Sequence, residues 1–164
     1  MEAFRRRLSS ISSLFNNRTM STSASLAWPT PITKYDVHIY WLPANQRQKY
    51  EASALLDRIA KQFPHLWQSR MHDRAIGPHP MPMAEIDVSK PEDFVTFVPW
   101  MAMNHGSLSV LIHPHTDDAV LDHTTHALWL GQPLPLDTDM LRAYQDQLNE
   151  RDRWEKAQKK EEEL

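Results

Sequence analysis

The sequence predicts one α+β domain in which four antiparallel strands pack against two helices on one face of a sheet. Three observations predict it: short stretches with alternating apolar residues, longer stretches with apolar residues at helical spacing, and their order along the chain, β-α-β-β-α-β. This order is the split βαβ pattern of a ferredoxin-like domain. A charged helix is expected to follow it.

The first predicted strand covers residues 35–42, and its side chains alternate in character. The apolar set is Val37, Ile39 and Trp41, and the polar set is Asp36, His38 and Tyr40. Successive side chains of a strand point to opposite faces. We therefore expect the apolar set to contact the helices and His38 to lie on the open face.

The first helix is predicted over residues 45–63, because its apolar residues recur at helical spacing before Pro64. They are Ala52, Leu55, Leu56, Ile59, Ala60 and Phe63. A more polar strand is expected over 66–76, a turn over 77–80, and a short strand over 83–88. These elements supply the first half of the split pattern.

The second helix is predicted to begin at a capping box formed by Ser89 and Glu92, and to end before Gly106. A nearly continuous apolar strand follows over 107–113. A helical turn and an extended piece are expected within 117–131. The last predicted element is a charged helix over 139–164.

The chain divides into three parts: a leader over 1–33, the domain over 34–138, and the charged helix over 139–164. The leader is rich in serine and arginine and has a single acidic residue, Glu2. This composition is typical of organellar transit peptides, including mitochondrial ones. The alternative, which we favour, is a disordered leader on a cytoplasmic protein.

The overall composition excludes several classes of function. The 164 residues are 41% hydrophobic and carry a formal net charge of −3, so no basic field favours nucleic acid. No apolar stretch approaches the roughly 20 residues that cross a bilayer. Since the chain has no cysteine, a metal would need histidine or carboxylate ligands.

Nine histidines are the clearest compositional sign of chemistry, and seven of them lie between His72 and His126. His113 ends the last strand, and the first and last strands of a split βαβ sheet are neighbours, so His38 and His113 should approach each other. His79 stands between prolines, which hold its backbone stiffly. Three neutral imidazoles on one face would suit zinc, copper, iron or nickel.

Two further histidines follow the last strand. His123 and His126 are three residues apart, and Asp122 precedes His126 by four, a spacing that lets a carboxylate orient an imidazole on a helical turn. The alternative is that Asp122 is only a charge at a helix start. His72 and Asp73 form an exposed pair on the second predicted strand.

A four-stranded sheet with both helices on one face leaves its other face open. A second copy of the chain or a C-terminal cover would bury it. We expect a homodimer that joins two sheets into a dimeric α/β barrel.

Five segments resemble the DOPA 4,5-dioxygenase family, in order, between residues 35 and 136. They are 37–40 (VHIY), 77–83 (GPHPMPM), 111–114 (LIHP), 122–131 (DHTTHALWLG) and 133–136 (PLPL). The chain departs from the family pattern at Asp36, where members often carry histidine, and near His115 and Asp117, where members often carry Asn and Gly. These departures bear on the preferred substrate more than on metal binding.

The resemblance implies a ferredoxin-like fold and an oxidoreductase, a non-haem iron extradiol dioxygenase. Such an enzyme uses Fe(II) and O₂ to cleave a catechol such as L-DOPA, giving a seco-DOPA or muconic semialdehyde type of product. Fungal members contribute to betalain-type pigments. The family's histidine positions fall on His38, His72, His79, His113, His123 and His126.

From this resemblance we expect His38, His79 and His113 to hold the metal, with zinc as a substitute for iron. The expected catalytic residues are His123, which would take a catechol proton, together with His126 and His72. The substrate-binding residues would be Arg70, Arg74 and Tyr40, the arginines through the carboxylate of an amino-acid catechol.

Three alternatives remain open at this stage. The first is a module that binds a small aromatic molecule on the same fold, without catalysis or with zinc. The second is a zinc hydrolase that uses metal-bound water. The third is an interaction protein that acts through its C-terminal helix.

Overall fold

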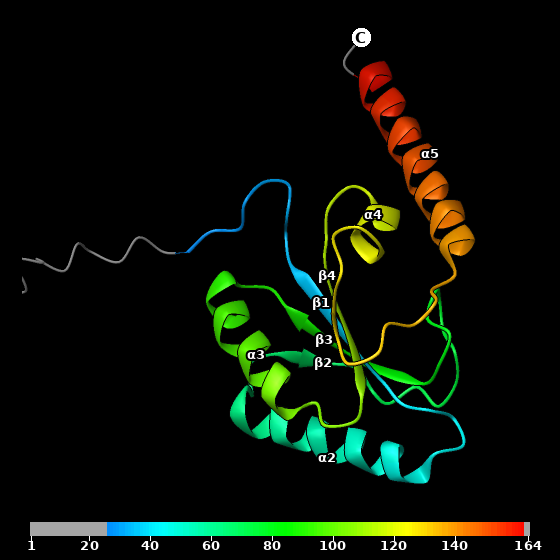
Figure 1. The fold of residues 1–164 in the computed structure, drawn as a ribbon. Helices are drawn as coiled ribbons and strands as arrows, with labels where there is room; N and C mark the ends of the chain where they lie inside the picture. The colour runs from blue at the N-terminus through cyan, green and yellow to red at the C-terminus, as the bar shows by residue number, and fades with distance from the viewer. Residues whose placement is uncertain (1–25, 163–164) are drawn as a thin grey trace, which may run out of the picture.

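The computed structural model describes residues 26–162 as an α+β structure with a five-stranded antiparallel sheet in the order β2-β3-β1-β4-β5 (Figure 1). The strands are β1 (Tyr35–Tyr40), β2 (Trp67–Gln68), β3 (Met83–Val88), β4 (Ser109–Pro114) and β5 (Leu128–Leu130). The helices are α2 (Gln46–Gln62), α3 (Pro91–Asn104), α4 (Ala119–His123) and α5 (Thr138–Glu162).

The sheet confirms the predicted neighbours and corrects the predicted strand number. β1 lies between β3 and β4, so the first and last predicted strands are paired. The extended piece after α4 becomes a fifth strand, β5, on the outer edge of β4. The long strand predicted over 66–76 was wrong, because β2 ends at Gln68. Beyond it the Ser69 hydroxyl accepts from the Glu85 N–H at 2.9 Å, a role that a backbone carbonyl has in a regular ladder.

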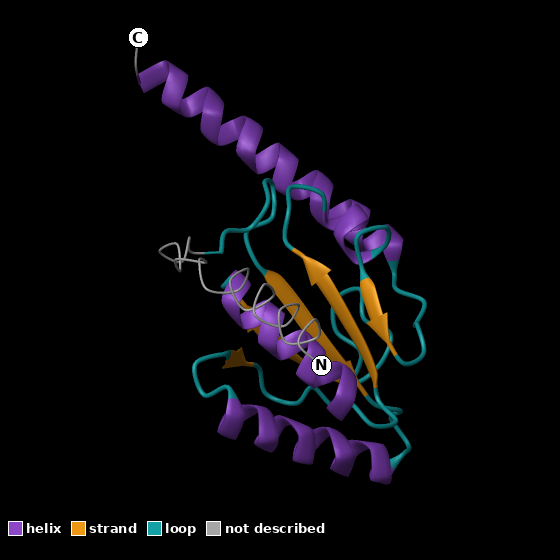
Figure 2. Cartoon of the chain, turned by 60° about the vertical axis from the view of Figure 1, so that its left-hand side comes forward, coloured by secondary structure: helices purple, strands orange, loops and turns teal. Residues whose placement is uncertain are grey.

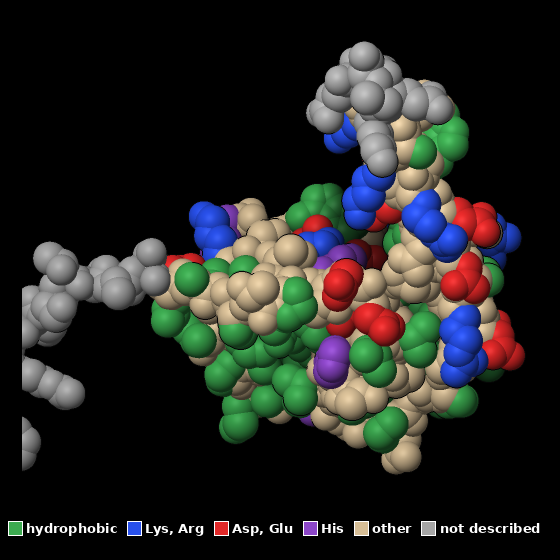
Figure 3. Space-filling model, turned by 90° about the horizontal axis from the view of Figure 1, so that it is seen from above, with side chains coloured by type: hydrophobic (Ala, Val, Ile, Leu, Met, Phe, Trp, Pro, Cys, Tyr) green, Lys and Arg blue, Asp and Glu red, His purple; other side chains and the backbone are tan. Residues whose placement is uncertain are grey.

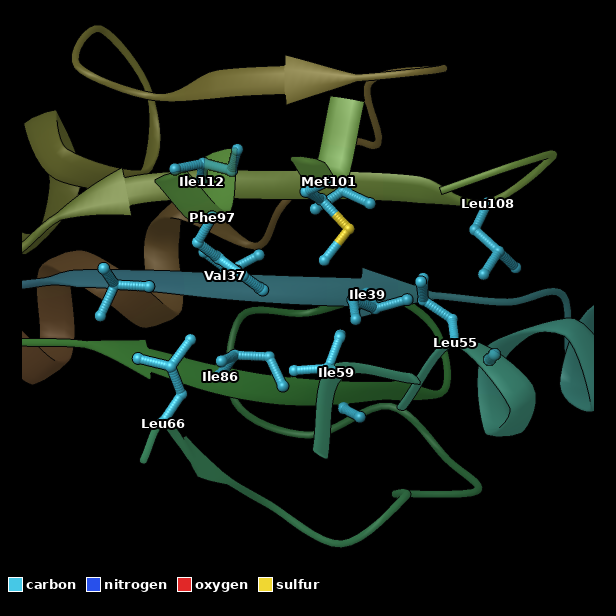
Figure 4. Packing of buried hydrophobic residues seen from close by; sticks show 14 of the residues in the cluster. Val37, Ile39, Leu55, Ile59, Leu66, Ile86, Phe97, Met101, Leu108 and Ile112 are labelled. Carbon is cyan, nitrogen blue, oxygen red and sulfur yellow. The ribbon is translucent and has the colours of Figure 1, made fainter. Parts of the chain in front are cut away.

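One face of the sheet is covered by α2 and α3 (Figures 1 and 2). The apolar set of β1 is at most 1% exposed and belongs to the same cluster as Leu55 and Ile59 of α2 and Phe97 and Met101 of α3. Figure 4 shows these side chains pointing toward each other between the sheet and the helices. Burial of this apolar surface is the main stabilising contribution to the domain.

The two long helices of this face begin in different ways. Asn45 is the N-cap of α2, and its side chain accepts from the Gln48 N–H at 3.1 Å. The capping box predicted for α3 was wrong, because the N-cap is Lys90 and no side chain bonds there. Pro91 instead starts α3, where its missing N–H costs nothing.

The opposite face is partly covered by the chain itself. Tyr40, Met83 and Leu111 form a second buried cluster, and apolar residues of the segment 127–136 pack against it. Gly131 allows this segment to pass close to the sheet: its φ is +74°, and a Cβ there would lie 2.9 Å from the Leu108 carbonyl oxygen. The rest of this face carries polar side chains.

The two ends of the described chain lie against the domain in different ways. Trp28 contacts Tyr35 and Phe94, with ring centroids 5.2 and 5.8 Å away. Most of the predicted leader, residues 1–25, lies outside the described residues. At the other end, α5 extends beyond the body of the domain (Figure 2). Within residues 26–162, no helix is long and apolar enough to cross a membrane.

Candidate metal centre

Three histidines from three elements converge on the polar face of the sheet. His38 of β1 and His113 of β4 are diagonal neighbours in the strand register, and their Nε2 atoms lie 3.1 Å apart. His123 of α4 stacks beside them, with its ring centroid 3.8 Å from that of His113. One nitrogen from each residue lies within 4.8 Å of the other two. The approach of His38 to His113 was predicted from the strand order.

Backbone carbonyls hold two of these imidazoles in a form suited to metal binding. His113 Nδ1 lies 2.9 Å from the Pro114 carbonyl oxygen, and His123 Nδ1 lies 2.8 Å from the Ala119 carbonyl oxygen. Since a carbonyl only accepts, Nδ1 carries the proton in both rings, and each Nε2 has the lone pair that a metal needs; that of His113 is directed to His38 Nε2, 3.1 Å away. Carbonyl contacts of this kind commonly orient histidine ligands of metals.

His38 differs from the other two in its hydrogen bonding. Its side chain is buried, and its Nδ1 has no hydrogen-bond partner among the described residues. Burial, and then the neighbouring histidines, lower the pKa of His38 well below its usual value. Burial also lowers the pKa of His113 to about 4 and lowers that of His123. All three are therefore neutral at pH 7, as metal ligands must be, and the donor set fits a divalent transition metal.

A fourth histidine, His79, lies against this group with a different partner. Its ring centroid is 4.1 Å from that of His38, while its Nδ1 lies 2.7 Å from the hydroxyl of Tyr40. Both side chains are buried, and burial lowers the pKa of His79 to about 3 and raises the pKa of Tyr40. Among the described residues, the group whose ligand atoms lie within 4.8 Å of one another contains His123 and not His79, so the geometry favours His123 as the third ligand.

Asp36 is placed near the histidines but is already paired. Its carboxylate oxygens contact His115 Nε2 at 2.5 Å and Lys34 Nζ at 2.9 Å. Burial alone would raise the pKa of Asp36, but these two partners overcome it and hold that pKa below its usual range. Two groups that contain Asp36 also bring ligand atoms within 4.8 Å: one with His113 and His115, the other with Glu85 and Asp87. We favour the three imidazoles because the Asp36 carboxylate is occupied.

The predicted pair of Asp122 and His126 forms, with His126 Nδ1 3.3 Å from a carboxylate oxygen. Asp122 is buried and also accepts from the N–H and hydroxyl of Thr116, at 2.7 and 2.8 Å. It thereby ties α4 to the loop that follows β4. His126 itself is 43% exposed and lies outside the converging group.

Three other predicted residues gather elsewhere. Arg70, His72 and Arg74 line a separate surface pocket of about 360 Å³, formed only by residues of the stretch 70–76. Both arginines are exposed. His72 makes only an isolated bridge to Met83. The structure therefore does not bring these residues to the converging histidines.

A cleft of about 740 Å³ opens beside the histidines. His113, His115 and His123 line one side, and residues of α5 line the other. Figure 3 shows histidine and acidic side chains in the hollow between the domain and the C-terminal helix. The spacing of two residues from His113 allows His115 to lie on the same side of an extended chain, but its loop position favoured a solvated side chain, so the sequence did not assign it to the site. The sequence predicted α5 as a charged helix and assigned it no residue of the site.

Comparison with known proteins identifies a family and relatives of this chain. The model of the Dopa 4,5-dioxygenase family matches residues 35–140, which is more than half of the chain. This range contains His38, His79, His113 and His123 and ends at the start of α5.

Two curated relatives and one solved structure show the range of similarity. An uncharacterized 21.2 kDa protein of Botryotinia fuckeliana is 40% identical over 120 residues, and a DOPA 4,5-dioxygenase of Amanita muscaria is 29% identical over 142 residues. These matches cover 69% and 81% of the chain, but only 66% and 62% of the relatives, just under two thirds. A crystal structure of a candidate dioxygenase from Nostoc punctiforme is 34% identical, with a TM-score of 0.63 over 69% of this chain and 94% of that one.

Proposed function

We propose that this chain, which belongs to the Dopa 4,5-dioxygenase family, is an Fe(II)-dependent extradiol dioxygenase that opens the ring of a catechol such as L-DOPA. Both atoms of O₂ would enter the product, a muconic semialdehyde of the seco-DOPA type. The observation that carries the proposal is the convergence of His38, His113 and His123 beside a cleft large enough for an aromatic ring.

His38, His113 and His123 are the residues that would hold the iron. When bound, the iron supplies the redox chemistry and Lewis acidity that allow a catechol to react with O₂. The three ligands are neutral imidazoles, so they leave the charge of a divalent ion uncompensated. This favours a catechol that has lost a proton.

His79 is the residue that we assign to proton transfer. When its Nδ1–H is donated to the Tyr40 oxygen, its Nε2 keeps a lone pair and can accept a proton from a catechol hydroxyl. Burial keeps the ring neutral beforehand. This exchanges the roles that the sequence suggested, where His79 was a ligand and His123 the proton acceptor.

Asp122 acts as a positioning residue in this proposal. Its two bonds to Thr116 fix the turn between β4 and α4, the two elements that carry His113 and His123. It touches neither ligand nitrogen. Its effect would be to hold the distance between these two ligands.

The experiment that tests the proposal is anaerobic loading of the protein with Fe(II), followed by addition of a catechol panel that includes L-DOPA and then of oxygen. We expect oxygen uptake and a yellow ring-opened product with at least one catechol. No uptake with any catechol would reject ring cleavage.

Zinc-loaded protein is the matched control, because imidazoles also suit zinc and a zinc hydrolase or an aromatic-binding module remains the rival. If the chain is an iron dioxygenase, we expect the zinc-loaded protein to bind catechols without consuming oxygen. Hydrolysis of ester substrates that is supported by zinc and independent of oxygen would favour the rival enzyme.

The homodimer inferred from the sequence stays a prediction. Trp67 of the edge strand β2 is 56% exposed, and Ile76 in the loop that follows is 44% exposed, which gives a second copy apolar surface to cover. Sedimentation velocity will measure the oligomeric state. A single boundary of monomer mass at micromolar concentration would contradict the predicted homodimer.

A further inference from the structure

We propose that α5 forms the substrate-selecting wall of the cleft and that Arg151 on it binds an anionic substituent of the ring-cleavage substrate. The inference rests on the proposed function, because it names the residue that would bind the side chain of the catechol, which in L-DOPA carries a carboxylate. The starting observation is that α5 lines the side of the cleft that faces His113 and His123.

The base of α5 is fixed to the elements that carry the candidate site. Leu141 is 4% exposed, and the Gln145 side chain accepts from the Ala119 N–H at 2.8 Å, at the first residue of α4. The Asp137 N–H, just before the helix, donates to the Pro78 carbonyl at 2.9 Å, next to His79. This part of α5 is therefore a fixed wall of the site.

The wall changes in character along its length. Tyr144 and Leu148 line the cleft on the same face of the helix as Leu141, one and two turns further on. Arg151 lines the cleft one more turn away, roughly 10 Å along the axis from Tyr144. This order suits a ligand whose aromatic ring contacts the apolar part of the wall. A short chain would then carry its anionic group to the guanidinium of Arg151.

The local charges indicate the kind of anion. Among the described residues that line the cleft, Arg151 is the one arginine. Three aspartates line it as well: Asp152 beside Arg151, and Asp117 and Asp122 at the histidine side, where Asp122 is engaged by Thr116 and His126. The Arg151 side chain is 65% exposed, and its Nε lies 3.8 Å from a Glu155 oxygen, too far for a strong hydrogen bond, so the guanidinium can turn to a ligand. One guanidinium beside a carboxylate suits a monoanion, which it can bind through two parallel N–H donors.

The test compares two catechols that differ mainly in the carboxylate: 3-(3,4-dihydroxyphenyl)propionate and 4-ethylcatechol. Their dissociation constants are measured by calorimetry on the full chain loaded with zinc and without oxygen, so that nothing turns over. We expect the wild type to prefer the acid. Arg151→Ala should reduce that preference on the order of tenfold, and Arg151→Lys should restore part of it.

The matched control is Arg153→Ala, which removes the same charge from the same helix but from a residue that does not line the cleft. Equal preference for the two catechols in the wild type would overturn the inference. An equal effect of the two alanine variants would overturn it too. If the preference is present but the iron-loaded protein consumes no oxygen, ring cleavage fails while the role of Arg151 stands.

Discussion

The two faces of β1 show how one strand serves two purposes. Toward α2 and α3 it places Val37 and Ile39, followed directly after its end by Trp41, among apolar side chains, each at most 1% exposed. On the other face it places His38 and Tyr40 among histidines, although these side chains are nearly as buried. The difference is in the partners and not in the burial. Buried imidazoles need polar partners for their ring nitrogens, whereas buried aliphatic groups need only close packing.

The largest expected effect comes from the polar face. His113→Ala should abolish metal binding and turnover, because it removes a central member of the converging group. Metal content after dialysis and the circular dichroism spectrum will check this. His65→Ala is the control, since His65 pairs with Asp93 on the surface and should keep the metal. Retained iron in the His113 variant would reject the ligand assignment.

The next prediction tests whether His79 is the proton acceptor or a metal ligand. His79→Gln should keep the metal but lower kcat by about 10²–10⁴-fold, the usual loss when a general base is removed. Metal content and steady-state kinetics on the same preparation measure both quantities. If His79→Gln loses the metal and His123→Gln keeps it, the roles return to those that the sequence suggested.

The apolar face should respond in stability and not in chemistry. Ile39→Ala removes a fully buried side chain beside His38 in the sequence, and should lower the free energy of unfolding by about 2–5 kcal/mol. Urea unfolding measures that change. The metal content of the folded fraction should stay at the wild-type level. If fully folded Ile39→Ala protein loses metal, the packing of the apolar face also determines the positions of the histidines on the polar face.

Acid should act on the polar face alone. The folded-state pKa values of His79 and His113, about 3 and about 4, lie below the usual value near 6.5. The unfolded chain therefore binds protons first, and stability falls as the pH falls below 6.5 until the folded-state values are reached. At pH 5 the loss is at most about 2 kcal/mol for each imidazole. Burial raises the pKa of Glu85 to about 7, which shifts stability in the opposite direction over this range. Urea unfolding of metal-free wild type and His113→Gln at pH 7.5 and pH 5 therefore isolates the contribution of His113, and the variant should lose less stability on acidification.

The smallest expected effect lies outside both faces. Arg70→Ala and Arg74→Ala should change kcat/KM for acidic catechols by less than about twofold, because both residues line the separate pocket of the stretch 70–76. Kinetics with 3-(3,4-dihydroxyphenyl)propionate will check this. A tenfold rise in KM for either variant would restore these arginines as substrate ligands and weaken the case for Arg151.

The sequence by itself determined the parts of the molecule that follow from local periodicity and strand order. Alternation in β1 assigned its two faces, and the β-α-β-β-α-β order made β1 and β4 neighbours, which brought His38 to His113. The resemblance of the short motifs assigned the chain to the correct family. These inferences held because the two-residue period of a strand and the pairing of strands depend little on the rest of the chain.

Only the tertiary structure decided which of the further histidines suggested by the resemblance lie close enough to this pair to share a metal ion. The path of the chain after β4 depends on contacts across many residues, such as the bond from Ala119 to Gln145 and those from Thr116 to Asp122. That path brings His123 to the site, places α5 along the cleft and leaves Arg70 on another surface. No short-range pattern encodes it, because loops are positioned by the packing of the elements that they join.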